Sequence, residues 1–215
     1  MTALLFPVGH LLARPAGPAQ SITAALGGGT VPTGPRDARV RVGDAVRRLT
    51  QVQFLAWSAA HGDADAGPDT AGRTRPQVEH WLRDQGLSAP DRTVQELLAD
   101  RLLAEADPHG SDAVGFARGH RVNPLLWGLG NSPEEPWLFS IGLMGQEVAR
   151  VGRAMFEIWA WGPVDSDLWS SCRTFAELER DDDNAEDPGH VLAGFLDGLH
   201  GLLAVQAAYL DVSST

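Results

Sequence analysis

Apolar and polar residues follow two different periods along the first half of this chain, and together they predict a mixed α+β protein. Short apolar runs broken by proline and glycine in residues 1–31, and alternation in residues 38–42, are typical of strands. Three later segments space their apolar side chains as amphipathic helices do: residues 50–60, 74–86 and 93–105. The N-caps expected for them are Thr50, Thr74 and Thr93. Residues 114–126 alternate again, which predicts a two-stranded ribbon.

The second half of the chain repeats this order of elements. Apolar periodicity predicts strands and then helices over residues 137–143, 146–151, 153–161, 166–179 and 189–210. Three short echoes accompany the order: Phe54 to Trp57 returns as Phe156 to Trp159, Leu102 to Ala104 as Leu202 to Ala204, and Ser21-Ile22 as Ser140-Ile141. Their shared order favours an internal duplication, with one module over residues 1–121 and a second over residues 122–215.

Length and composition fit this organisation. A chain of 215 residues with 43% apolar side chains has material for two domains of about 100 residues each. No run of about 18 apolar residues predicts a membrane span, and the N-terminal segment is a poor signal peptide. Cys172 is the only cysteine, which excludes an internal disulfide and a zinc cluster of thiolates. We expect a cytoplasmic protein.

The basic residues narrow the chemistry. All 17 are arginine, so neither a Schiff-base lysine nor a P-loop lysine is available within this chain. Arginine, alanine, glycine and proline have GC-rich codons, which favours a GC-rich bacterial source such as an actinobacterium. The net charge of −11 repels phosphate backbones and suits a basic partner.

Three helices followed by a ribbon, over residues 38–127, resemble the winged-helix superfamily and the small peptide-recognition domains of peptide-modification pathways. The resemblance rests on element order, and it implies two winged-helix-like modules packed face to face. Bacterial chromosome-partitioning accessory subunits are similar in being small, acidic and built from tandem winged helices. Function carried over from a fold alone is an analogy.

Candidate catalytic and metal sites are weak. None of the seven histidines falls in a paired helical spacing, and the acidic run at residues 181–187 lacks the glycine and glutamate of a calcium loop. Cys172 has no neighbouring base and is expected in a core. Gly128 and Gly130 are not followed by the helix of a dinucleotide fingerprint. We therefore expect no enzyme activity, no cofactor and no metal.

Candidate partner-binding residues cluster after the third helix. They are Arg118, His120, Arg121, Trp127 and Trp137. The two tryptophans, and Trp161, lie near turns rich in glycine and proline, where the alternative is the seam between the two modules. Four other tryptophans, Trp57, Trp81, Trp159 and Trp169, fall within helices and are expected to fill the cores. Gly194, Gly198 and Gly201 share one side of the last helix, where a second backbone is expected to pack closely. That backbone belongs either to the first module or to a second copy in a homodimer.

The resulting hypothesis is a non-catalytic adaptor or regulator that binds a protein or peptide partner, by strand addition or by docking of a helix in a groove. The alternative is a winged-helix transcriptional regulator that binds DNA. A reading helix should be basic, yet residues 93–105 carry Glu96, Asp100 and Glu105 against Arg101 alone. DNA contact would then depend on other arginines, at residues 36, 39, 41, 47 and 48 and at residues 118 and 121.

Overall fold

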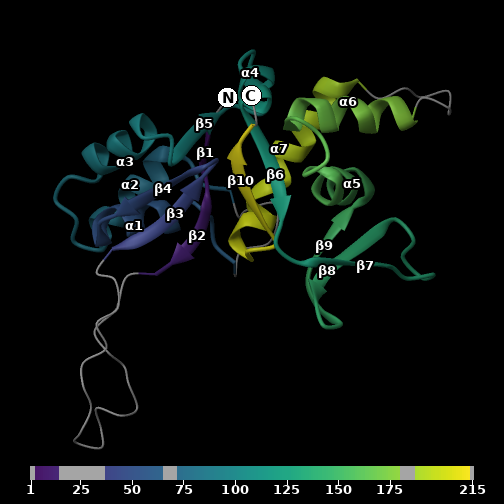
Figure 1. Cartoon of the computed structure of the whole chain (residues 1–215), viewed down its shortest axis with the longest axis horizontal. Coiled ribbons are helices and arrows are strands. Elements are labelled where there is room, and N and C mark those ends of the chain that lie inside the picture. Colours follow the sequence, from purple (N-terminus) through teal and green to yellow (C-terminus); the bar gives the residue numbers. More distant parts are fainter. Residues whose placement is uncertain (1–2, 15–36, 65–71, 180–186, 214–215) are drawn as a thin grey trace, which may run out of the picture.

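A computed structural model describes residues 3–14, 37–64, 72–179 and 187–213 (Figure 1). It confirms the mixed α+β class. The helices are α1 (Gln51–Ala59), α2 (Arg75–Asp84), α3 (Pro90–Ala99), α4 (Ala113–Gly119), α5 (Arg153–Trp161), α6 (Leu168–Leu178) and α7 (Pro188–Ala204). The strands are β1 (Leu4–Pro7), β2 (His10–Ala13), β3 (Ala38–Val42), β4 (Ala45–Leu49), β5 (Leu103–Ala106), β6 (His120–Pro124), β7 (Trp127–Asn131), β8 (Leu138–Leu143), β9 (Gln146–Gly152) and β10 (Ala208–Val212).

In the first half of the chain, the first strand pairs with the last one. β1 pairs antiparallel with β5, and β2, β3 and β4 form a separate antiparallel sheet. Helices α1 to α3 lie between these strands in sequence, and α1 and α2 each begin at a threonine that makes a capping box. Their apolar faces bury one core with Val40, Leu49, Leu82 and Leu97. The N-caps predicted at Thr50 and Thr74 are therefore confirmed.

The second half has the same order of elements. Strand β6 pairs antiparallel with β10. A separate three-stranded sheet consists of β7, β8 and β9, and α5 to α7 come between β9 and β10 in sequence. Figure 1 shows this sheet with α5 and α6 on one side of the molecule, and the first sheet with α1 to α3 on the other. The core of the second half contains Ile141, Trp159, Leu196 and Leu203.

Two similar features accompany the repeated order, a tryptophan at the seventh position of α1 and of α5 that donates to a backbone carbonyl, and a left-handed residue after the third helix. The indole N–H of Trp57 donates to the carbonyl of Val8 at 3.1 Å, and the indole N–H of Trp159 donates to that of Ala207 at 3.0 Å. The chain leaves α3 through Arg101 and α7 through Gln206, both in the left-handed region with φ of 57° and 56°. That the halves arose by duplication stays a prediction, as do the module boundaries.

The echo of Leu102 at Leu202 is misplaced, because Leu102 follows α3 whereas Leu202 lies within α7. The backbone N–H of Leu102 bonds Leu97, and the corresponding bond in the second half joins Ala207 to Leu202. The Ser21-Ile22 echo, and the strands expected in residues 15–31, lie outside the described residues.

Strand β1 ties the two halves together. Leu5 enters the first core, whereas Phe6 and Val8 point the other way into the second. Alternate side chains of a strand point to opposite faces, so one short strand serves both cores. Gly9 then donates its N–H to Leu210 in β10 at 2.7 Å. Within the described residues the halves consequently share apolar contacts as well as backbone hydrogen bonds.

Three local expectations are wrong. Thr93 lies inside α3, which starts at Pro90, because a proline in the first turn needs no amide donor. Residues 114–126 are not a ribbon: α4 occupies 113–119, and β6 pairs with the distant β10. The last helix ends at Ala204, and Leu210 belongs to β10. The ribbon on which the winged-helix resemblance depends is thus absent from its expected place, and the resemblance stays a prediction.

Candidate functional site

An exposed apolar surface covers one end of the β7–β8–β9 sheet. We call it the apolar face and define it by five side chains that are all more than a third exposed: Trp127, Leu129, Leu143, Met144 and Val148. Trp127 is 64% exposed and Met144, in the β8–β9 turn, is 85% exposed. Large exposed apolar side chains that gather in one place mark interaction sites more often than isolated ones do.

The register of the sheet explains why Trp127 and Leu129 point outward, whereas Leu143 follows Phe139 and Ile141 on the other side of β8 and is exposed because it lies at the end of the strand. Phe139 stacks on Phe156 of α5 at 4.7 Å between ring centroids, which fixes the inner face. A side chain at Gly128 would meet the ring of Phe156 at 2.6 Å, so Gly128 also faces inward. Its neighbours Trp127 and Leu129 must then face outward, because side chains alternate along a strand.

The predicted partner-binding residues are split between different sheets. Trp127 pairs with Gly142, whereas Trp137 precedes Leu138, so the two tryptophans lie at opposite ends of β8. Trp137 is nevertheless 62% exposed. Both tryptophans are accessible, but they do not form one cluster.

The basic part of that prediction lies on α4 and β6. His120 is half-buried, its ring stacks on Phe116 at 4.4 Å, and its Nδ1 donates to the carbonyl of Phe116 at 2.8 Å. Burial lowers the pKa of His120, so its ring is neutral at neutral pH. Arg118 is exposed, whereas Nε of Arg121 is buried without a hydrogen-bond partner among the described residues. His120 therefore holds α4 against β6.

The glycines of α7 have different surroundings. A side chain at Gly198 would meet Cε of Met155 at 2.5 Å, whereas one at Gly194 would meet no described atom within 4 Å. No second backbone approaches these two positions in the described part of the chain. Gly201 is half-buried near the end of the helix. Contact between α7 and the first half is instead made by His200, whose Nε2 donates to the carbonyl of Leu5 at 3.0 Å.

A second surface, which we call the arginine face, covers β3 and β4 with Arg39, Arg41 and Arg48, all exposed. Arg47 is exposed too, but it pairs with buried Val40 and so lies on the other side of the sheet. Arg39 lies directly opposite Arg48 in the antiparallel register. Like charges in that position destabilise a sheet. No described carboxylate forms an ion pair with Arg39, Arg47 or Arg48.

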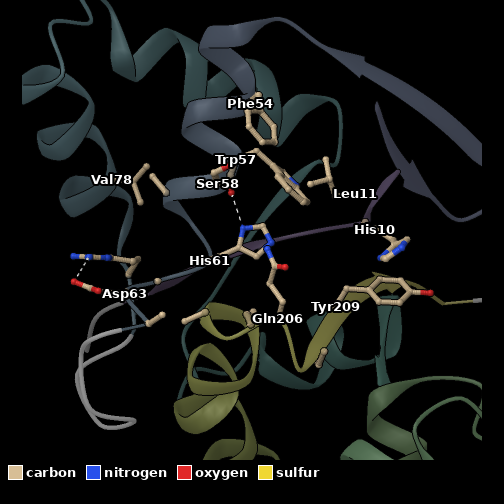
Figure 2. A pocket seen from close by; sticks show the side chains of 18 of the residues that line it. His10, Leu11, Phe54, Trp57, Ser58, His61, Asp63, Val78, Gln206 and Tyr209 are labelled. Atoms are coloured by element: carbon tan, nitrogen blue, oxygen red, sulfur yellow. Dashed lines mark hydrogen bonds and ion pairs between the residues drawn. The ribbon is translucent and has the colours of Figure 1, made fainter. Parts of the chain in front are cut away.

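A cavity of about 620 Å³ lies where the two halves meet (Figure 2). We call it the junction pocket. Its walls come from β2, α1 and α2 of the first half and from the α7–β10 turn of the second. Phe54, Trp57 and His61 line it from one side, and Gln206 and Tyr209 from the other. The size is in the range of small-molecule sites, and lining by both halves is typical of them.

Sequence patterns missed the junction pocket, because its residues are far apart in the chain. From the sequence, His61 is expected only to end a helix, and Gln206 is expected inside the last helix. Trp81 was expected in the core, yet it is 38% exposed and lines the pocket. A signal did exist for Met144, since Met144-Gly145 falls between two alternating segments where a hairpin turn belongs.

Other chemistry is limited in the described residues. Cys172 is fully buried, and burial raises its pKa to about 12, so the thiol stays protonated, as expected of a core residue. Among the described side chains, no group of three or more histidines, cysteines or carboxylates is placed to hold a metal ion. No helix in the described ranges has both the length and the apolar character needed to cross a membrane.

Comparisons with known proteins add no family. No protein-family model, no curated protein and no solved structure matches this chain. Evidence for the function therefore comes from the apolar face, the arginine face and the junction pocket.

Proposed function

We propose that this protein is a non-catalytic adaptor or regulator, and that its apolar face binds a protein or peptide partner. The observation that carries the proposal is the exposure of Trp127 and of Met144 in the β8–β9 turn, at the end of one sheet where Leu129, Leu143 and Val148 are also exposed. Tryptophan and methionine are enriched at protein interfaces, where a few large anchors supply most of the affinity.

Strand pairing supports the same use of this sheet. β8 is the central strand, so β7 and β9 each have one edge that pairs with no described strand. An extended peptide can add to such an edge through backbone hydrogen bonds while its side chains contact the neighbouring apolar face. The net charge of −11 favours a partner with basic residues around its apolar anchors.

Site-specific photo-crosslinking tests the proposal. The photoreactive residue p-benzoylphenylalanine replaces Met144 in one variant and Arg92, exposed on α3, in the control. We expect one partner to be captured from the source cell through position 144 and not through position 92. Trp127→Ser should then weaken the affinity for that purified partner about tenfold or more, because a desolvated anchor is lost. Unchanged affinity with this variant would refute the role of the apolar face.

A second candidate function is DNA binding, and the arginine face favours it. Arg39 and Arg48 stay opposed without a described counterion, which a phosphate backbone would relieve. Helix α3 is unsuited to DNA contact, because its exposed Glu96 and the exposed Asp100 that follows it would repel phosphates. Contact would have to come from strands β3 and β4.

A salt series with mixed-sequence duplex DNA separates the two functions. If DNA is the partner, affinity falls steeply as salt rises, and Arg39→Gln with Arg48→Gln should reduce the slope of log K against log salt by about two. The matched control is Arg83→Gln with Arg92→Gln, two exposed arginines already paired with Glu79 and Glu96. Binding that is absent or independent of salt would eliminate the DNA function.

A further inference from the structure

The junction pocket has two polar groups that nothing described satisfies, one from each half of the chain. Neither the apolar face nor the arginine face contributes to it. Its volume of about 620 Å³ suits a small molecule rather than a folded partner. The chemistry of the two groups indicates which kind of molecule fits.

The first group is the ring of His61, just after α1. Its Nδ1 lies 3.0 Å from the carbonyl oxygen of Trp57. A carbonyl can only accept, so Nδ1 carries the proton. Burial lowers the pKa of His61 to about 4, against the opposing effect of that hydrogen bond. At neutral pH the ring is therefore uncharged, and Nε2 offers a lone pair with no proton of its own.

The second group is the carboxamide of Gln206, in the turn between α7 and β10. Figure 2 shows its side chain extending toward His61. Gln206 has a φ of 56°, a conformation that favours glycine at the residue after a helix. No hydrogen bond of its side chain occurs within the described residues. Gln206 is exposed, so its amide is accessible from solvent as well as from the pocket, and a non-glycine residue held at positive φ beside a cavity is a candidate for a binding role.

The rest of the wall combines aromatic rings with charged groups. Phe54 and Trp57 lie nearly parallel, with ring centroids 6.3 Å apart and an interplanar angle of 25°. Arg73, at one end of the pocket, is 3.5 Å from the carboxylate of Asp63, which offsets its charge. At the other end Tyr209 accepts a hydrogen bond from Arg41 and contacts the ring of His10. Arg14, which is exposed, also lines the pocket, so arginine charge is present in its wall while the ring of His61 is itself uncharged.

We propose that the junction pocket binds an uncharged planar heteroaromatic molecule, whose N–H or O–H donates to Nε2 of His61 while Gln206 contacts its polar edge. The flat body of the molecule lies against Phe54 and Trp57. A carboxylate is disfavoured, because it has no proton for Nε2 and would be desolvated beside an uncharged ring. Such a ligand contacts both halves, so its binding stabilises their junction.

Ligand-observed fluorine NMR on the full chain tests this directly. The probes are 5-fluoroindole and 5-fluoroindazole, their N-methyl derivatives, and 5-fluoroindole-2-carboxylate. We expect the two N–H compounds to bind, and the N-methyl derivatives to bind about tenfold more weakly or not at all, since the donor is lost. The carboxylate should not bind. The Nε2 resonance of His61 should shift on addition of the N–H compounds only.

A matched pair of variants assigns the site. Gln206→Gly removes the carboxamide and suits the left-handed backbone, so the fold is retained while affinity falls. Arg101→Gly makes the same change at the corresponding turn of the first half, outside the pocket, and should leave affinity unchanged. The proposal is wrong if no probe binds up to about 1 mM, if N-methylation has no effect, if the carboxylate binds best, or if the two variants behave alike.

Discussion

The two halves of this molecule are alike inside and different outside. Each half has a strand, a three-stranded sheet, three helices and a returning strand, and each anchors its first sheet-following helix by a buried tryptophan. The outward faces of the two sheets differ, because β3 and β4 carry opposed arginines, whereas β7 carries exposed Trp127 and Leu129. Across the latter sheet the outward side also holds the linked Ser140, Glu147 and Arg150. Packing constrains inward positions in both halves, whereas outward positions are free to serve different partners.

The largest expected effect comes from removing the two matched tryptophans. Trp159→Ala should lower the free energy of unfolding by about 3–5 kcal/mol, because it opens a cavity and removes the indole hydrogen bond to the carbonyl of Ala207, which keeps only its bond from the N–H of Leu125. Trp57→Ala should lower it less, since Trp57 already borders the junction pocket on one side. Chemical denaturation monitored by circular dichroism measures both values.

Trp161→Ala is the control for this pair, because Trp161 is 61% exposed at the end of α5. Its removal should change stability by less than about 1 kcal/mol. A larger loss for Trp57→Ala than for Trp159→Ala would contradict the argument that the open pocket beside Trp57 reduces the cost of its removal.

Local periodicity was sufficient where the nearest neighbours decide the structure. The α5 helix was predicted with the correct bounds, and the capping boxes at Thr50 and Thr74 formed as the side chains indicate. Errors came where a distant strand competes for the backbone. Val122 lies in an alternating segment that predicts a local hairpin, yet it pairs with Leu210. The spacing of leucines in residues 189–210 predicts that Leu210 belongs to a helix.

The candidate sites depended on the same distinction. The sequence leaves Trp127 open between the seam of the two modules and a partner surface, and only the structure, with Gly128 facing the ring of Phe156, shows that Trp127 is exposed. The junction pocket could not be expected, because His61 and Gln206 meet only after β1, β10 and α1 have packed. No pattern of residue spacing along the chain predicts that these two residues lie close together.

A smaller effect separates the junction from the two cores, and it is controlled by pH. His200 is fully buried between the halves, its ring stacks on Phe6, and burial lowers its pKa to about 4. The unfolded chain takes up this proton below the ordinary value of 6.5, whereas the folded chain does so only near 4. Stability is therefore fully present above pH 6.5 and is lost as the pH falls toward 4, by about 3 kcal/mol at most.

His200→Gln isolates this contribution. Glutamine can still donate to the carbonyl of Leu5 from the position of Nε2, but it cannot titrate. The loss of stability between pH 7 and pH 4.5 should shrink in this variant by about 2–3 kcal/mol, with the remainder due to His61, His10 and His120, whose pKa values are also lowered. His80→Gln, at an exposed position of α2, should keep the full pH dependence. If His200→Gln loses as much stability on acidification as the native protein, the junction is hydrated and the two cores alone determine the response to pH.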